Sequence, residues 1–559
     1  MDFPKLVGEE ILKRKPKDRK EILRLRDSLA KIHKPKKLPS LIQILISMPV
    51  EKIKILKPLL LSKPTRTMSG VSPIAIMTKP MPCPHGKCIY CPGGIGSPFG
   101  DVPQSYMGTE PATMRGIRNN YDPYLQIFNR IEQYVLLGHT FDKIELIIMG
   151  GTFPSFPKKY QEEFVKYSFK AMNDFSDIFF NKNGEFNYNK FKEFFELPCE
   201  NFENKERTKR IQEKLKKLKK TCTLKKEQEK NESSFIRCVA LCIETKPDWG
   251  LLEHGNQMLK LGCTRVELGI QSVYEDVIKH AHRGHTIKDT KDSIRILKDL
   301  GFKVAGHYMP GLPLTTKKRD LEGMKQLFSN EDFKPDMLKI YPTMVSKGTP
   351  LYADYKQKKF KPLTTKEAAK LIIEFKKHVP EYCRIMRIQR DVPTKQWASG
   401  VDITNFRQHI FQNNDIKCRC IRCREPRGRK IDWNKVKVKV NEYNASEGKE
   451  FFISAEDTKN DILIGFTRMR FPNKPLRKEI TKNSALIREL HVYGTATALG
   501  GEGLVQHKGI GKKLLKKAES IAKQNKKEKI IIISGVGVRP YYYKLNYKKE
   551  GPYVSKLIK

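Results

Sequence analysis

Short strand-like runs alternate with amphipathic helical segments between residues 71 and 390. The runs include DKIELIIMGG, RCVALCIETKPD, CTRVELGIQSV, GFKVAGHYMPGLP and DMLKIYPTMV, and a typical helical segment spans residues 290–300. Parallel strands need crossover connections, usually helices, so this repetition predicts an α/β protein with a parallel barrel or a doubly wound sheet. At 559 residues the chain exceeds what one hydrophobic core serves, and two or three domains are expected.

The remainder of the chain lacks this repeat. Residues 1–70 are helical and strongly basic, and residues 181–233 form a charged helical insertion within the βα region. A polar, cysteine-bearing linker covers residues 391–440, and residues 441–559 have a strand and helix pattern of their own. The sequence therefore predicts a basic helical segment, a βα domain of residues 71–390, a linker and a C-terminal α/β domain.

The charge of the chain limits its partners. Lysine and arginine outnumber aspartate and glutamate by 108 to 62, a formal net charge of +46, which favours a polyanionic partner such as nucleic acid. The longest apolar runs are too short to span a bilayer, and the N-terminus lacks the apolar core of a signal peptide. We expect a cytoplasmic protein with reduced cysteines. For the basic helix of residues 11–37, a solvated face and an RNA contact both remain open.

Three cysteines lie within nine residues of the loop PCPHGKCIYCPGG: Cys83, Cys88 and Cys91. A structural zinc ion generally takes four ligands, and His85 is the only further candidate nearby. Three thiolates on one tight loop, directly before a βα region, suit a [4Fe-4S] cluster whose fourth iron stays open to an exogenous ligand. Iron–sulfur coordination is the favoured interpretation, and zinc is the alternative.

Further motifs follow in order along the chain: MGGTF, IETKPD, GIQS, RGHT and KIYPT. Together with CPHGKCIYC they resemble the radical S-adenosylmethionine (SAM) superfamily and, within it, the family of Elongator catalytic subunits. The resemblance implies a TIM-like partial barrel in which the [4Fe-4S] cluster binds SAM. It assigns SAM contacts to strand ends, where barrel enzymes carry their chemistry, at Gly150, Gly151, Thr152, Glu244 and Gln271. Lys246 departs from the family, which more often has arginine there.

A second cysteine group, in KCRCIRCREPRG, comprises Cys418, Cys420 and Cys423. A second redox cluster is conceivable, but this loop follows no barrel strand and lies in a polar linker. A structural Zn²⁺ that joins two domains is favoured, and the resemblance implies the same. His409, Cys383 and a histidine from the barrel remain candidates for the fourth ligand. We expect no chemistry from the other cysteines, which are Cys199, Cys222, Cys238, Cys242 and Cys263.

The C-terminal block contains a strand, ALIRELHVYG, and then the glycine-rich start of a helix, QHKGIGKKLLKK. The free N-H groups and the dipole at such a helix start favour a pyrophosphate. With the segment IIIISGVGVRPYYYKLNYKKEGPY, the block resembles the GNAT acetyltransferase fold, which binds acetyl-CoA. Asn546 stands where that family usually has glycine, and asparagine also tolerates a left-handed backbone.

The GNAT resemblance assigns roles to several positions. Tyr542 matches a tyrosine near the thioester sulfur, where a phenol could protonate the leaving thiolate, and Tyr541 is a second catalytic candidate; packing at a sheet edge is the alternative for both. The acetyl-CoA contacts that the resemblance implies are Lys143, Glu489, Leu490, His491, Val492, Gln506, Gly509, Ile510, Gly511, Lys512 and Tyr542.

A radical SAM barrel, a cysteine-bearing linker and a GNAT domain in one basic chain resemble the Elongator catalytic subunit family of archaeal or bacterial type. The resemblance implies an enzyme that forms the 5-carboxymethyl group on the wobble uridine of tRNA from acetyl-CoA and a SAM-derived radical. It implies binding of the anticodon stem-loop, an external electron donor, and action without the other Elongator subunits. A protein lysine acetyltransferase with a structural Fe-S barrel and a non-enzymatic tRNA-binding module are the alternatives.

Overall fold

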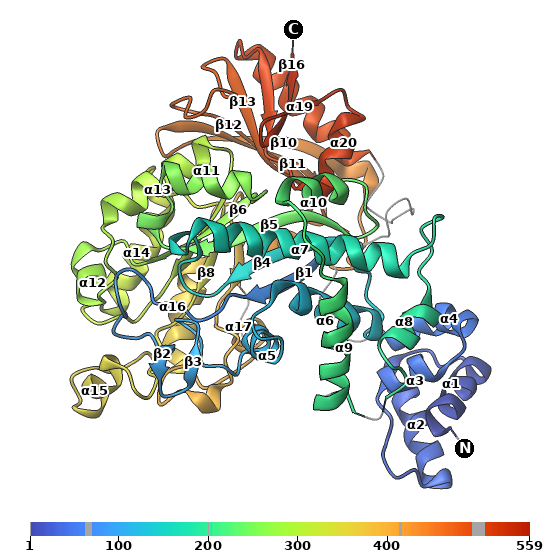
Figure 1. Cartoon of the computed structure of the whole chain (residues 1–559). Coiled ribbons are helices and arrows are strands. Elements are labelled where there is room, and N and C mark those ends of the chain that lie inside the picture. Colours follow the sequence, from blue (N-terminus) through green and yellow to red (C-terminus); the bar gives the residue numbers. More distant parts are fainter. Residues whose placement is uncertain are drawn as a thin grey trace.

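The computed structural model describes residues 2–61, 70–199, 201–202, 204–412, 416–494 and 509–558. They form a bundle of short helices at the N-terminus, a large parallel sheet with helices outside it, and a second sheet at the C-terminus (Figure 1). No helix among these residues is both long enough and apolar enough to cross a membrane.

The central sheet has seven strands in the order β1-β4-β5-β6-β7-β8-β9, and every neighbouring pair is parallel. Because the order follows the chain and β1 does not pair with β9 among the described residues, the sheet curves into an open, partial barrel. The predicted α/β class is confirmed. The strands are β1 (Ser72–Met77), β4 (Lys143–Met149), β5 (Arg237–Thr245), β6 (Arg265–Gln271), β7 (Lys303–Tyr308), β8 (Met337–Ile340) and β9 (Arg384–Arg387).

Helices connect the strands and cover the outer face of the sheet, as parallel pairing requires. Their apolar faces are buried against the strands, while charged residues face outward. The helices in these connections are α6 (Pro123–Leu136), α7 (Lys158–Phe179), α11 (Leu252–Lys260), α12 (Glu275–His280), α13 (Ile287–Asp299), α14 (Lys317–Ser329), α15 (Pro350–Lys356) and α16 (Thr365–Lys376). A small hairpin of β2 (Gly94–Ser97) and β3 (Gly100–Val102), followed by α5 (Pro111–Arg118), lies between β1 and α6.

The N-terminal residues form four helices with an apolar core of their own. They are α1 (Phe3–Arg14), α2 (Arg19–His33), α3 (Leu41–Ser47) and α4 (Val50–Leu60). Val7, Ile11 and Ile22 are buried inside the bundle, so the lysines and arginines between them lie on its surface. The bundle is joined to the insertion by Lys192, which donates to the Met48 carbonyl at 2.8 Å.

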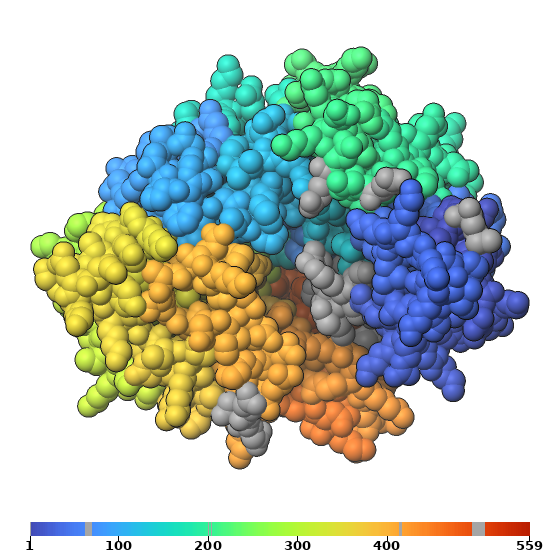
Figure 2. All heavy atoms as spheres, turned by 90° about the horizontal axis from the view of Figure 1, so that it is seen from below, coloured from blue at the N-terminus to red at the C-terminus, as the bar shows by residue number. Residues whose placement is uncertain are grey.

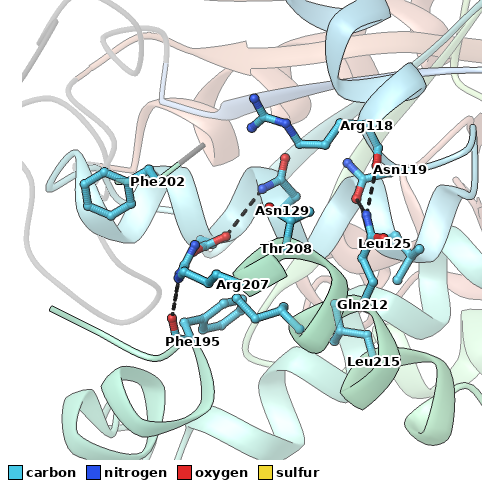
Figure 3. A pocket seen from close by; sticks show the side chains of 12 residues that line it. Arg118, Asn119, Leu125, Asn129, Phe195, Phe202, Arg207, Thr208, Gln212 and Leu215 are labelled. Carbon is cyan, nitrogen blue, oxygen red and sulfur yellow. Dashed lines mark hydrogen bonds and ion pairs between the residues drawn. The ribbon is translucent and has the colours of Figure 1, made fainter. Parts of the chain in front are cut away.

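The insertion contains three helices, α8 (Tyr188–Phe194), α9 (Lys205–Leu218) and α10 (Leu224–Asn231). Arg207 of α9 forms a buried ion pair of 2.8 Å with Glu132 of α6 and also donates to the Phe195 carbonyl (Figure 3). Gln212 donates to the Asn119 side chain at 3.2 Å. The cavity between these helices holds only about 30 Å³, about the share of one water molecule, so it is a packing seam rather than a substrate site.

The C-terminal sheet has the order β10-β11-β12-β13-β14-β16-β15, and only β13 and β14 pair in parallel. Helix α19 (Ile510–Gln524) lies against β11, β12 and β13, and α20 (Arg539–Tyr543) follows β14. The strands are β10 (Val436–Ala445), β11 (Gly448–Asp457), β12 (Ile462–Phe471), β13 (Ser484–Val492), β14 (Lys529–Ile532), β15 (Lys548–Glu550) and β16 (Tyr553–Leu557).

The second sheet is docked on the amino-terminal edge of the parallel sheet. Arg470 of β12 forms an ion pair of 2.6 Å with Asp299, at the end of α13. Tyr553 of β16 donates to the Leu300 carbonyl at 2.9 Å. All of these groups are buried, and apolar residues beside both sheets, such as Phe302 and Ile533, belong to one core, so the interface is both apolar and polar.

Candidate active site

The cysteine loop lies at the carboxyl edge of the parallel sheet, directly after β1. The Cys83 sulfur is 3.5 Å from the Thr152 hydroxyl, at the end of β4. The Cys88 sulfur accepts from Arg283 at 3.3 Å and lies 3.2 Å from His85 Nε2. The sulfur atoms of the linker cysteines Cys418, Cys420 and Cys423 all lie within 4.8 Å of each other, whereas those of Cys83, Cys88 and Cys91 do not form such a group. The wider spread favours a polynuclear cluster over a single zinc ion.

Two cations lie close to these thiols. Burial raises the pKa of the Cys91 thiol to about 11, with the Ser105 N-H opposing, and burial also raises that of Cys83. Arg283 and Lys246 oppose the effect at Cys83. Burial and the same two cations lower the pKa of His85 to about 3, so its imidazole is neutral near pH 7. Burial thus keeps the free thiols of Cys83 and Cys91 protonated despite the nearby cations, whose positive charge would favour thiolates once a cluster is bound.

Two consecutive glycines allow the end of β4 to approach the cysteine loop. Gly150 and Gly151 have φ of +128° and +84°. A Cβ at Gly150 would lie 2.1 Å from the Thr78 hydroxyl, and one at Gly151 would lie 3.6 Å from the Cys83 sulfur. Glycine is needed at both positions, and the backbone there stays open toward the thiol.

The two polar residues assigned to SAM lie on neighbouring strands. Gln271 has φ +67°, and its side-chain oxygen is buried without a partner among the described residues. Its side chain lies beside Gly269. The Gly269 carbonyl accepts a hydrogen bond from Arg283 at 2.8 Å. Glu244 instead accepts from Tyr106 at 3.0 Å and from Lys339 at 3.1 Å. Gln271 is therefore close to the cysteine loop, whereas Glu244 faces the barrel interior.

The barrel interior contains further buried charges. Lys339 forms ion pairs with Glu244 and Glu267, and Glu267 also contacts His307 Nε2 at 2.9 Å. Burial and Lys339 lower the pKa of His307. Glu244, Glu267 and His307 have ligand atoms within 4.8 Å of each other, but the Lys339 ammonium already supplies the positive charge between the carboxylates. We therefore do not interpret this group as a metal site.

Sequence reasoning did not single out Arg283 or Lys339. Both lie in quoted motifs, RGHT and KIYPT, so the signal was present in the sequence. The sequence does not show that Arg283 contacts Cys88 or that Lys339 contacts Glu244, because these partners are distant along the chain.

The linker cysteines lie together between the two sheets. The sulfur atoms of Cys418, Cys420 and Cys423 are within 4.8 Å of each other, and those of Cys420 and Cys423 are 3.5 Å apart. Within the described part of the chain this group has three members, so it includes neither His409 nor Cys383. Hydrogen bonds from Cys418 and Cys423 lower the pKa of Cys420 well below its usual value. The donor set is suited to a thiophilic ion.

The linker loop is attached to both sheets. Ile421, in α18 (Ile421–Arg424), donates its N-H to the Cys383 carbonyl beside β9 at 2.9 Å. Arg424 forms a buried ion pair of 2.8 Å with Glu456 of β11. A metal at the thiols would therefore stabilise the junction of the two sheets.

In the C-terminal unit, the start of α19 lies beside the end of β13. Gly509 caps the helix with φ +74° and has no neighbour within 4 Å of a built Cβ. A Cβ at Gly511 would lie 3.0 Å from the Tyr541 hydroxyl and 3.8 Å from Val492. Leu490 faces the same way, because alternate residues share a face of a strand. Ile510 is buried in the helix interface and Lys512 is exposed, while Gln506 lies outside the described residues.

The tyrosines of α20 lie beside this helix start. Burial raises the pKa of Tyr542, and burial also raises that of Tyr541, so both phenols stay protonated near neutral pH. The hydroxyl of Tyr541 is the closer of the two to Gly511. A protonated phenol at this position can donate a hydrogen bond to a bound ligand.

The other residues assigned to acetyl-CoA do not point toward the start of α19. Glu489 points toward the parallel sheet, where it pairs with Lys303 at 2.7 Å and Arg468 at 2.9 Å. His491 stacks on Phe466, with ring centres 6.1 Å apart. Lys143 begins β4 at the edge opposite the cysteine loop, beside Arg237 of β5. That edge faces the C-terminal unit, because Gly537 approaches Arg237 there.

Two family models match the chain. The Radical SAM superfamily covers residues 80–325, and the Radical_SAM C-terminal domain covers residues 335–414. The matched ranges contain the cysteine loop and most of the parallel sheet.

Proteins similar to the chain over nearly its full length carry consistent names. A tRNA uridine(34) acetyltransferase of Methanocaldococcus jannaschii is 44% identical over 99% of this chain and 96% of its own length. Elongator complex protein 3 of Saccharomyces cerevisiae is 40% identical over 95% of this chain and 90% of its own length. The solved structure of archaeal Methanocaldococcus infernus Elp3 with an N-terminal deletion is 39% identical, with a TM-score of 0.71, over 88% of this chain and 100% of that one.

Proposed function

We propose that the chain, which belongs to the family of tRNA uridine(34) acetyltransferases and Elongator complex protein 3 subunits, modifies the wobble uridine of tRNA by radical chemistry. The product would be a 5-carboxymethyl group whose two carbons come from acetyl-CoA. The observation that carries the proposal is the loop of Cys83, Cys88 and Cys91, with sulfur atoms spread too widely for one ion and with Arg283 and Lys246 beside them.

The residues around this loop fit a [4Fe-4S] cluster and SAM. The three cysteines would supply the thiolates, and the Gly150–Gly151 backbone leaves room for a ligand beside Cys83. The unpartnered oxygen of Gln271 would accept a hydrogen bond from SAM. When bound, the cluster and SAM supply a carbon-centred radical that takes a hydrogen atom from the substrate. The buried barrel interior would exclude water from this step.

The proposed reaction joins the methyl carbon of acetyl-CoA to carbon five of uracil and replaces a C–H bond on each. One hydrogen leaves as an atom, and the other leaves as a proton while its electron returns to the oxidised form of the external one-electron donor. Water then cleaves the thioester and releases CoA as the thiol. An external one-electron donor of low potential would start the reaction.

The start of α19 would hold the diphosphate of acetyl-CoA through its free N-H groups. The protonated phenols of Tyr541 and Tyr542 would donate to the leaving thiolate. Lys143 would contact the CoA phosphates from the edge of the sheet that faces the C-terminal unit.

For the tRNA, the surface offers a hollow on the face seen in Figure 2. The N-terminal helices (dark blue), α5 (light blue) and residues near 390–410 (orange) border it, and part of the C-terminal unit is visible at its base. The net charge of +46 favours binding of the chain to phosphates. An anticodon loop already exposes its wobble base, so the base could enter without melting a stem.

We also propose a structural Zn²⁺ at Cys418, Cys420 and Cys423. Three thiolates within 4.8 Å fit its usual ligands, and the loop contacts both sheets.

The test is an anaerobic incubation of the purified chain alone with SAM, acetyl-CoA, a low-potential reductant and a tRNA with uridine at position 34. We expect 5-carboxymethyluridine in the digested tRNA and 5′-deoxyadenosine in the supernatant. The Cys88→Ala variant and a tRNA with cytidine at position 34 are the controls. Unmodified tRNA together with acetylated protein lysines would support the lysine acetyltransferase alternative, and tRNA binding without either product would support a binding module.

A further inference from the structure

A buried lysine ends α16 beside the linker cysteines. The Lys376 side chain has 0% exposure, and its Nζ donates to the Cys418 sulfur at 3.2 Å and to the Cys423 sulfur at 3.6 Å. Its other contact is the Phe411 ring, 5.0 Å away. Among the described residues no carboxylate forms an ion pair with it, although most buried cations of this chain have one.

A buried ammonium group requires a nearby negative charge. The carboxyl end of α16 offers only about half an elementary charge, and the ring face of Phe411 offers less. The sulfur atoms of Cys418 and Cys423 are the remaining groups in contact with the Lys376 Nζ. Arg407 also lies near these sulfur atoms, but its guanidinium donates to the Ile385 carbonyl at 3.2 Å and the residue is partly exposed.

We infer that Lys376 is the counter-ion and positioning residue of a three-thiolate metal site. Three thiolates and one Zn²⁺ have a net charge of minus one, and the Lys376 ammonium makes the buried assembly neutral. Its N-H groups also orient the sulfur atoms of Cys418 and Cys423 toward a common point. The inference rests on the proposed zinc site and adds to it a condition on the fourth ligand: a neutral group keeps the assembly neutral, whereas a fourth anionic ligand would leave the site more negative than Lys376 can balance.

The experiment measures zinc and iron separately in the full chain after anaerobic reconstitution. Zinc retention is titrated with a competing chelator and read by elemental analysis. Lys376→Met keeps the length of the side chain and removes the charge, and Lys376→Arg keeps the charge. Lys377→Met is the matched control, because this neighbour is 55% exposed and pairs with Glu374 at 2.6 Å.

We expect Lys376→Met to weaken zinc binding by about 10- to 100-fold, as removal of a partner of a metal ligand typically does. The zinc affinity of Lys376→Arg and of Lys377→Met should stay close to that of the parent protein. The iron content should be unchanged in all three variants. Equal zinc affinity in Lys376→Met and the parent overturns the inference and leaves the zinc site standing. Zinc loss in Lys376→Arg with iron retained overturns it too, since the charge would then not be what matters. A parent protein that binds no zinc overturns the site itself.

A second experiment measures the melting temperature in a background where the effect of Lys376→Met should have the opposite sign. In a variant with Cys418, Cys420 and Cys423 all changed to alanine, the counter-ion has no partner and is a buried, uncompensated charge. Lys376→Met should therefore raise the melting temperature in that background and lower it in the zinc-loaded parent. The same direction of change in both backgrounds overturns the inference.

Discussion

Arg488 of β13 and Asp336, directly before β8, form a bidentate ion pair across the two sheets, with both N–O distances 2.7 Å. Both side chains are wholly buried. Asp336 also accepts from the Val304 N-H at 2.8 Å, and Arg488 also donates to Glu450 at 2.8 Å. The pair therefore couples the strand that the GNAT resemblance assigns to acetyl-CoA with the parallel sheet that carries the cysteine loop.

Replacing Arg488 by methionine should destabilise the protein by about 3 kcal/mol, because it removes the bidentate partner of the buried Asp336 and leaves it only the longer ion pair with Arg468, at 3.6 Å. Chemical denaturation followed by tryptophan fluorescence measures the change. The control is Arg210→Met, which removes a largely exposed pair with Glu196 and should cost less than about 1 kcal/mol. Similar losses in both variants would contradict a special role for the interface pair.

A pH effect follows from Glu489. Burial opposes its ionisation, but Lys303 and Arg468 outweigh burial and lower its pKa to about 2. A carboxylate with a lowered pKa in the folded state stabilises the protein above its unfolded pKa of about 4.3, and the contribution is lost as pH falls toward 2.

The free energy of unfolding should therefore fall from pH 5 to pH 2, with about 3 kcal/mol of the loss due to Glu489. In Glu489→Gln the slope over this range should be smaller and the stability at pH 7 lower. Denaturation curves at several pH values compare the two proteins. An identical slope would show that Glu489 is not ion-paired in solution.

The regular parts of the molecule were predictable because local patterns determine them. The βα repetition predicted the parallel sheet, and cysteine spacing predicted that Cys418, Cys420 and Cys423 lie together. The docking of one sheet on the other was not predictable. Strand alternation separates Glu489 from Leu490, but only the docking shows that the former faces Lys303 and the latter faces α19. Lys376 reads as an ordinary helix-terminal lysine, and its separation from Cys418 by 42 positions in the chain hides their contact.

At the cysteine loop, Cys88→Ala should abolish the brown colour of the reconstituted protein and the cleavage of SAM, because one thiolate ligand is removed. Visible absorption and release of 5′-deoxyadenosine report the two effects. The control is Cys199→Ala, a partly exposed cysteine outside both groups, which should leave both readouts unchanged. SAM cleavage that persists in Cys88→Ala would contradict the iron–sulfur assignment.

At the start of α19, Gly511→Glu should prevent binding of acetyl-CoA and leave tRNA binding intact. A side chain there would reach the Tyr541 hydroxyl, only 3.0 Å from the built Cβ, and would bring negative charge to a diphosphate site. Gly428→Asn, in the linker and away from α19, is the matched control, since asparagine tolerates the φ of +83° there and meets no neighbour within 4 Å of its Cβ. Calorimetric titration with acetyl-CoA compares the three proteins, and unchanged affinity in Gly511→Glu would exclude this loop as the diphosphate site.

The basic turn between α1 and α2 should contribute to tRNA binding. Its acidic neighbours are engaged elsewhere: Glu9 pairs with Lys52 at 2.6 Å, and the carboxylates of Asp18 and Glu21 accept backbone N-H groups. Only Arg14 is neutralised nearby, by Glu10 at 2.7 Å. Exposed bases therefore remain available to phosphates, at Lys13, Lys15, Lys17, Arg19 and Lys20.

Deletion of residues 1–37 would remove α1 and α2 and expose the apolar core that they share with α3 and α4, so substitution is the better test. Changing the five bases to glutamine should weaken tRNA binding and flatten its dependence on salt, by about 0.7 to 0.9 in the log-log slope for each phosphate that the protein no longer neutralises. Iron content and acetyl-CoA binding should not change. The control replaces five exposed lysines of the C-terminal unit by glutamine, at Lys516, Lys523, Lys526, Lys544 and Lys548. If both sets reduce the affinity and the slope equally, the turn acts only through net charge, and the specific contact to RNA lies elsewhere on the surface.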